Sequence, residues 1–321
     1  MDINSIKQAR ERIRPYIIET PLLRLPGLDP HLGCRVYVKA ECMQTTGSFK
    51  LRGAMNKVLS LSEEEVKKGI VAVSSGNHGR GVAYAAKLLN THATVVMPDT
   101  ATKAKVEAIQ NLGANILFCK VEERFAVAGR ICEKEGATSV PPFDDEEIMA
   151  GQGTLGLEIA KQCPDLHKVI VPLSGGGLLS GVSTAIKTVA PEMKVYGAEP
   201  AAVPRYSESL KAGKRVTIES RKSVADALVA IKPGEKCFPY IVSNVEQVAA
   251  VSDAYILKAM KYLLMEGKLL AEPSSCIGMG AVLQGLIEVK PDDKVCFVIS
   301  GGNVGYEQLK MLDEACGGDW K

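Results

Sequence analysis

Short apolar segments alternate with helical segments along most of this chain, and this alternation constrains the fold more than any other feature. Alternation of this kind is typical of α/β units with parallel strands. We predict buried strands at residues 69–74, 93–97, 115–119, 169–173, 194–198 and 294–299, and helices at 79–90, 101–112, 122–135, 153–162, 178–189 and 306–315. The sequence therefore predicts an α/β fold with mostly parallel sheets flanked by helices.

Length and composition exclude several classes of protein. A chain of 321 residues is long enough for one large or two closely joined domains. A net charge of +2 gives no reason to expect nucleic acid as a partner, and no apolar run is long enough to span a bilayer. The nine cysteines form no Cys-x-x-Cys pair, and the N-terminus has no apolar signal-peptide core. We therefore expect a cytoplasmic globular protein without a zinc site or a disulfide framework.

Three of the predicted strands end in polar, glycine-rich turns. In open α/β sheets, ligands bind at the carboxyl ends of strands, where the following helices begin. We expect a ligand site there. The turns are Ser74-Ser75-Gly76-Asn77-His78-Gly79, Ser174-Gly175-Gly176-Gly177-Leu178 and Ser300-Gly301-Gly302-Asn303.

The first two turns suit anions. Hydroxyls, an amide and backbone N–H groups at a helix N-terminus suit a carboxylate in the first turn, although an ordinary serine-capped loop is the alternative. Three consecutive glycines in the second turn let the backbone approach a phosphate closely. This turn is not a Walker loop, and Ser180 stands where a dinucleotide fingerprint needs its third glycine. A purely structural turn is the alternative there as well.

Lys50 is the candidate nucleophile. It lies between Phe49 and Leu51 after a Thr-Gly-Ser turn that can open a helix. Burial would lower the pKa of its amine, and the neutral amine can form a Schiff base. The alternative is a helix lysine with its head in water. One amine, one phosphate turn and one anion-binding turn suit a cofactor that carries both an aldehyde and a phosphate, and pyridoxal phosphate fits that description.

Together, these motifs resemble the fold-type II pyridoxal-phosphate enzymes. The resemblance rests on the three turns and on Ser48-Phe49-Lys50-Leu51-Arg52-Gly53-Ala54, is collinear, and covers essentially the whole chain. It is closest to the serine/threonine dehydratase (threonine ammonia-lyase) and serine racemase group. It implies two open, twisted, mostly parallel sheets, with a large domain of residues 1–60 and 146–321 and a small mobile domain of residues 61–145. The cofactor would lie between these domains.

The resemblance also implies a role for each motif residue. Lys50 would bind the cofactor through a Schiff base and later remove the α-proton of the substrate. Phe49 would pack on the cofactor ring, Asn77 would bind its 3-oxygen, and Ser300 would bind its ring nitrogen. The backbone of Ser174, Gly175, Gly176, Gly177 and Leu178 would bind the phosphate. The substrate carboxylate would be bound by the loop of Ser74, Ser75, Gly76, Asn77 and His78.

These roles predict a β-elimination that converts L-threonine or L-serine to a 2-oxo acid and ammonia. Ser300 is a weak acid that would not keep the ring nitrogen protonated, which suits elimination better than transamination. A serine racemase using Ser75 as the opposite-face acid and base is a second possible function. A dehydratase of a different 3-hydroxy amino acid, such as 3-hydroxyaspartate, is a third, and a non-catalytic amino-acid-binding protein is a fourth. We expect a homodimer or a higher homo-oligomer.

The sequence departs from the pattern of this group at three positions. Ser174 replaces the first glycine of the phosphate turn, and Ala227 stands where glycine is common. Glu199 matches a ligand of a divalent cation, but Arg205 replaces the expected aspartate, and a guanidinium cannot ligate a cation. We expect no metal at Glu199 and expect Arg205 to pair with it instead.

Overall fold

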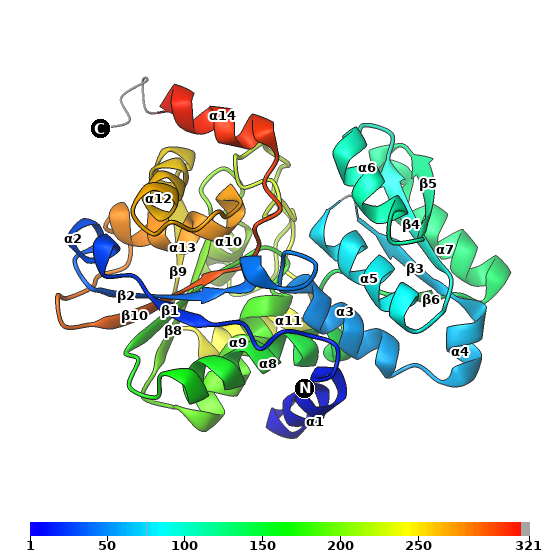
Figure 1. The fold of residues 1–321 in the computed structure, drawn as a ribbon, viewed down its shortest axis with the longest axis horizontal. Helices are drawn as coiled ribbons and strands as arrows, with labels where there is room; N and C mark the ends of the chain where they lie inside the picture. Colours follow the sequence, from blue (N-terminus) through cyan, green and yellow to red (C-terminus); the bar gives the residue numbers. More distant parts are fainter. Residues whose placement is uncertain (75, 316–321) are drawn as a thin grey trace.

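Two sheets form the framework of the computed structural model, which describes residues 1–74 and 76–315 (Figure 1). The larger sheet has the order β1-β2-β10-β7-β8-β9, and all of its neighbours are parallel except β1 and β2. The smaller sheet has the order β5-β4-β3-β6 and is parallel throughout. The strands of the larger sheet are β1 (Leu22–Arg24), β2 (Arg35–Ala40), β7 (Lys168–Pro172), β8 (Lys194–Pro200), β9 (Gln247–Val251) and β10 (Lys294–Ile299); those of the smaller are β3 (Ile70–Val73), β4 (Ala93–Pro98), β5 (Asn115–Cys119) and β6 (Thr138–Ser139). The predicted fold class is confirmed.

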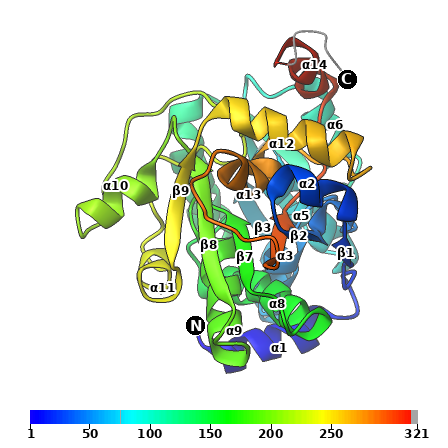
Figure 2. The same cartoon turned by 90° about the vertical axis from the view of Figure 1, so that its left-hand side faces the viewer.

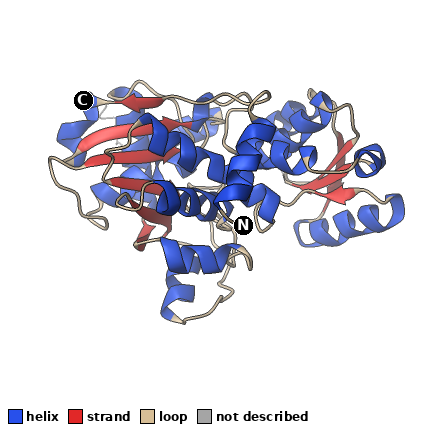
Figure 3. Cartoon of the chain, turned by 90° about the horizontal axis from the view of Figure 1, so that it is seen from below, coloured by secondary structure: helices blue, strands red, loops and turns tan. Residues whose placement is uncertain are grey.

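Helices cover both faces of the larger sheet (Figure 2). One face carries α1 (Ile3–Ile13), α8 (Glu146–Gln162), α9 (Gly177–Val189) and α11 (Cys237–Asn244), and the other carries α2 (Asp29–Leu32), α12 (Asp253–Met265) and α13 (Pro273–Leu283). The chain also forms α10 (Arg205–Lys211), α14 (Tyr306–Ala315) and the short 3-10 helices η1 (Pro26–Leu28), η2 (Glu41–Met43) and η3 (Val121–Glu123). The smaller sheet is accompanied by α4 (Glu63–Lys68), α5 (Asn77–Leu88), α6 (Lys103–Gln110) and α7 (Arg124–Glu135) and lies to one side of the molecule (Figure 3).

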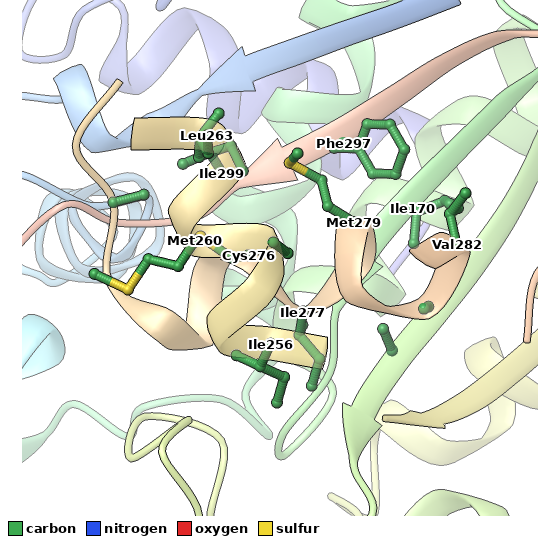
Figure 4. Packing of buried hydrophobic residues seen from close by; sticks show 14 of the residues in the cluster. Ile170, Ile256, Met260, Leu263, Cys276, Ile277, Met279, Val282, Phe297 and Ile299 are labelled. Atoms are coloured by element: carbon green, nitrogen blue, oxygen red, sulfur yellow. The ribbon is translucent and has the colours of Figure 1, made fainter. Parts of the chain in front are cut away.

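The main core lies between the larger sheet and the helices α12 and α13. Phe297 and Ile170 of the central strands lie beside Met279 and Val282 of α13, and all four are buried (Figure 4). A parallel sheet that is covered on both faces needs nearly continuous apolar strands, and β7 and β10 have them. This packing fixes the carboxyl ends of β7 and β10, where two of the glycine-rich turns begin.

Helix α3 (Lys50–Leu59) connects the two halves of the molecule, because it packs against α5 on one side and α8 on the other. The contact with α8 depends on Gly151, where an added Cβ would lie 2.7 Å from the carbonyl oxygen of Arg52. Lys50 is the first residue of α3. The candidate nucleophile therefore lies where the two sheets and their helices meet.

The predicted helix 153–162 begins earlier than expected, at Glu146. Asp145 accepts hydrogen bonds from the backbone of Glu147 and Ile148, which starts the helix seven residues before Gly153. Glycines disfavour a helix in isolation, but Gly151 of α8 allows this helix to pack closely against α3. The strands β1, β2, β6 and β9 were not predicted.

The segment before α8 joins the two sheets. Asp144 has a φ of 41°, in the left-handed region that non-glycine residues rarely adopt. Its carboxylate accepts hydrogen bonds from the backbone of Glu235, Lys236 and Cys237 at 2.9, 2.7 and 3.3 Å. These three bonds offset the backbone strain and hold the segment that joins the two sheets against the start of α11.

Among the described residues, no helix combines the length and the apolar character that a membrane crossing requires.

Candidate active site

Lys50 lies half-buried with its amine directed at the segment that joins the two sheets. Its Nζ donates a hydrogen bond to the carbonyl oxygen of Pro142 at 2.6 Å and lies 5.1 Å from the centre of the Phe49 ring. Burial lowers the pKa of this amine to about 8. A larger fraction of the amine is therefore neutral near pH 7 than for an exposed lysine.

Backbone hydrogen bonds connect the lysine segment to the third turn. The N–H of Phe49 donates to the carbonyl oxygen of Ser300 at 3.0 Å, and Ser48 and Gly301 form an isolated bridge. The side chain of Ser300 is buried, and its Oγ lies 3.0 Å from the Oγ of Ser275 on α13. The structure therefore brings the segment of Lys50 and that of Ser300 together and adds Ser275.

Asn77, the first residue of α5, is held by two side chains. Its Nδ2 donates to the carboxylate of Glu272 at 2.8 and 3.1 Å, and its Oδ1 accepts from Asn303 at 2.7 Å. Burial raises the pKa of Glu272 to about 7. An added Cβ at Gly301 would lie 3.2 Å from Asn77 Nδ2, so the first and third turns are in close contact.

The first turn places a neutral histidine near Lys50. His78 Nε2 lies 2.7 Å from the carbonyl oxygen of Val140, and burial lowers the pKa of His78 to about 3. The Oγ of Ser74 accepts from the N–H of Gly76 at 3.2 Å, and an added Cβ at Gly76 would meet no atom within 4 Å. Gly76 therefore borders open space. Ser75 lies outside the described residues.

The second turn joins β7 to α9. Gly176 has a φ of 110°, which strongly favours glycine, and the carbonyl oxygen of Gly175 accepts hydrogen bonds from Tyr206 Oη and Gly234 N, both at 2.9 Å. Ser174, where the resemblance expects glycine, has its Oγ 3.4 Å from the N–H of Ala230. Leu178, which follows Gly177 in the first turn of α9, is buried.

Phe143 lies over this turn. An added Cβ at Gly175 would lie 2.4 Å from the Phe143 ring. Since Pro142 contacts Lys50, the joining segment contacts both the candidate nucleophile and the candidate phosphate turn.

The residues present fit pyridoxal phosphate. Two helices that begin here, α5 and α9, have no side-chain cap among the described residues, so their first N–H groups are available to an anion. The Thr46 Oγ1, Ser48 Oγ and His78 Nδ1 atoms are buried without a hydrogen-bond partner in the described part of the chain. An anionic ligand with several acceptors and donors would satisfy such groups.

Glu199 and Arg205 lie beside the second turn and are both fully buried. Arg205 Nη1 is 3.8 Å from Glu199 Oε2. No group of three or more metal-ligating side chains occurs among the described residues.

Sequence reasoning missed Glu272, Ser275 and Phe143. Glu272 immediately precedes α13 and Ser275 lies in its first turn, and their contacts with Asn77 and Ser300 join residues 195 and 25 positions apart. A glutamate before a proline in an otherwise apolar stretch was the only local signal for Glu272, and such a signal is weak.

The family model described as pyridoxal-phosphate dependent enzyme matches residues 13–301, and the chain belongs to this family. Pyridoxal phosphate is therefore its cofactor. Among characterised proteins, an L-threonine ammonia-lyase of Thermotoga maritima is 42% identical over 97% of this chain and 77% of its own length. An L-threo-3-hydroxyaspartate ammonia-lyase of Saccharomyces cerevisiae is 38% identical over 96% of this chain and 94% of its own. The solved structure of maize serine racemase superposes with a TM-score of 0.92 at 37% identity, covering 97% of this chain and 96% of that one.

Proposed function

We propose that this protein is an ammonia-lyase that converts L-threonine or L-serine to a 2-oxo acid and ammonia. The observation that carries this proposal is the amine of Lys50. Its pKa of about 8 lies near neutral pH, and it donates to Pro142, whose neighbour Phe143 lies over the glycine-rich turn. An amine whose pKa lies near the working pH accepts a proton and returns it without a large free-energy cost. The similarity to the Thermotoga maritima threonine ammonia-lyase supports the choice of substrate.

Lys50 would serve as the base at the substrate's α-carbon. When bound, pyridoxal phosphate supplies an aldehyde for amine attachment and a ring that stabilises negative charge at that carbon. The first N–H groups of α9 and the loop Ser174–Leu178 would bind the phosphate. Phe49 would support one face of the ring, and Asn77 would donate to its 3-oxygen.

Ser300 favours elimination in this proposal. Its Oγ contacts the hydroxyl of Ser275, and neither hydroxyl is acidic enough to keep a ring nitrogen protonated. A less electron-withdrawing ring holds negative charge for a shorter time, which suits loss of a β-hydroxyl. Ser74, Gly76 and His78 would hold the substrate carboxylate, together with Ser75.

Racemisation is the second candidate function, because Ser75 is present in the sequence and maize serine racemase has the same fold. It needs an acid and base opposite Lys50, and Ser75 is the candidate. The relative that acts on L-threo-3-hydroxyaspartate adds this compound to the possible substrates. The side chains that would select among these substrates are those around Gly76.

One experiment separates these functions. The purified, cofactor-loaded protein is incubated with L-threonine, L-serine and L-threo-3-hydroxyaspartate, and both 2-oxo acid and the opposite enantiomer are measured. We expect 2-oxo acid from threonine and serine. Enantiomer formation without 2-oxo acid would contradict the proposal and establish the racemase. A protein that binds these amino acids and changes none of them would be a non-catalytic binding protein.

We also propose that residues 61–145 form a small domain that moves against residues 1–60 and 146–321, and that the protein is a homodimer or a higher homo-oligomer. The four-stranded sheet lies wholly within residues 61–145, which supports the division. Light scattering on the purified protein measures the oligomeric state, and a monomer would contradict that part of the proposal.

A further inference from the structure

Arg205 is a buried cation that the proposed reaction does not use. Its side chain has no exposed surface, although it begins α10 after a loop. An isolated buried charge is strongly unfavourable, so a fully buried arginine needs compensating partners. The identity of these partners shows what the residue holds in place.

Its guanidinium joins two segments that carry the second turn. Nη1 donates to the carbonyl oxygen of Leu173 at 2.9 Å, and Nη2 donates to that of Leu228. Leu173 immediately precedes Ser174, and the N–H of Ala230, two residues after Leu228, faces the Ser174 Oγ. Arg205 therefore fixes both segments that flank the start of the glycine-rich turn.

Glu199 completes the arrangement. Its two carboxylate oxygens accept hydrogen bonds from the N–H groups of Tyr206 and Ser207 at 2.9 and 2.7 Å. Tyr206 in turn donates from its hydroxyl to the carbonyl oxygen of Gly175. Burial raises the pKa of Glu199 and lowers that of Arg205, and the opposite charge of each partner counteracts both shifts.

The oxygens around the guanidinium are of the kind that bind Ca²⁺ or Mg²⁺, namely two carbonyls and one carboxylate. A divalent cation does not fit here, however, because the guanidinium already lies among these oxygens. One carboxylate is balanced by one arginine, and an added divalent cation would leave two uncompensated positive charges in a buried site.

We propose that Arg205 is a built-in cation that fixes the glycine-rich turn for phosphate binding and makes the protein independent of divalent cations. Arg205 is a positioning residue, since it reaches the turn through Leu173, Leu228 and Tyr206. This inference rests on the proposed role of the turn in binding the cofactor phosphate.

The test measures the dissociation constant of pyridoxal phosphate from the apoprotein, in EDTA and in excess Ca²⁺. The wild type should give the same value in both. Arg205→Ala and Arg205→Asp should bind about tenfold more weakly or worse in EDTA, the loss expected for charged hydrogen bonds. Ca²⁺ should restore much of the affinity of Arg205→Asp, which supplies a second carboxylate beside Glu199.

Arg24→Ala is the matched control. Arg24 also bonds to a carboxylate and a carbonyl, those of Asp29 and Val36, but these residues do not contact the turn, so its removal should leave the dissociation constant unchanged. If Arg205→Ala does not fold, Arg205→Lys keeps the charge and should bind with an intermediate affinity.

A wild type whose affinity falls in EDTA, or an Arg205→Ala variant that binds as the wild type does, would overturn the inference. A wild type that binds no pyridoxal phosphate in either EDTA or Ca²⁺ would instead contradict the proposed function. The two failures are therefore distinguishable.

Discussion

At the scale of single residues, the environment of Lys50 decides its chemistry. An exposed lysine has a pKa of about 10.4, whereas burial lowers the pKa of Lys50 to about 8. The neutral form of this amine therefore becomes abundant at a pH more than two units lower than for an exposed lysine.

The rate at which the apoprotein takes up pyridoxal phosphate should rise with pH and level off above about pH 8, because the neutral amine is the nucleophile. Stopped-flow absorbance across this range measures it. A rate that continues to rise toward the pKa of an ordinary lysine would contradict the assigned environment.

Glu272 should make the apoprotein less stable as the pH rises. Its folded-state pKa of about 7 lies above the unfolded value, so the folded protein retains a proton that the unfolded chain releases. Its contribution is present below about pH 4.5 and is lost as the pH rises through about 7. Glu272→Gln should remove this dependence and raise the free energy of unfolding at about pH 8 by up to about 3 kcal/mol.

Urea unfolding of the apoprotein at both ends of this range measures the effect. Glu63→Gln, at an exposed carboxylate, is the control and should leave the pH dependence as it is. Parallel pH profiles for the wild type and Glu272→Gln would contradict the assignment.

At the scale of elements, α3 is fixed by a buried network of charges. Arg52 donates from Nε and Nη2 to Glu41, both at 2.8 Å, and from Nη1 and Nη2 to Glu158 at 2.6 and 2.8 Å. Lys39 on β2 donates to the same Glu158 at 2.6 Å. Two cations thus balance two carboxylates, and the network joins β2, α3 and α8 two residues from Lys50.

Arg52→Ala should lower the free energy of unfolding by about 3–5 kcal/mol, because it leaves two carboxylates buried with one cation between them. Denaturant unfolding measures the loss. Arg35→Ala, which removes an exposed pair with Asp292, is the control and should cost about 1 kcal/mol or less. Equal effects of the two substitutions would show that the buried network does not fix α3.

This network also explains what the sequence could not predict. The strands that end in glycine-rich turns are apolar, apart from the lysine that begins β7 and β10, and were found from their pattern. Strand β2 was missed because Lys39 reads as an exposed residue until its partner Glu158 is known. The N-terminal part of α8 was missed because a glycine such as Gly151 disfavours a helix locally. Only the close contact of Gly151 with α3 explains its place in α8. Local patterns do not contain such distant contacts.

At the scale of the whole molecule, the candidate site lies where the two sheets meet. The segment Pro142–Asp144 contacts Lys50, the glycine-rich turn and the start of α11. A movement of the smaller sheet would therefore alter the contacts at all three places. The turns and Lys50 were predictable because they are local motifs. Glu272, Ser275 and Phe143 were not, because folding alone brings them there.

Saturating the cofactor-loaded protein with an amino-acid ligand should reduce its radius of gyration if residues 61–145 form the proposed small domain and close over the site. Small-angle X-ray scattering measures this. A scattering profile that does not change on saturation would contradict the proposed mobility of residues 61–145.

The central claim is that Lys50 is the residue that binds the cofactor. Borohydride reduction of the loaded protein, followed by peptide mass mapping, tests it most directly, because reduction makes the bond between the amine and the cofactor permanent. We predict a single modified peptide that contains Lys50, and its absence from Lys50→Ala. Modification of a different lysine, or reduction without any modified peptide, would contradict the account.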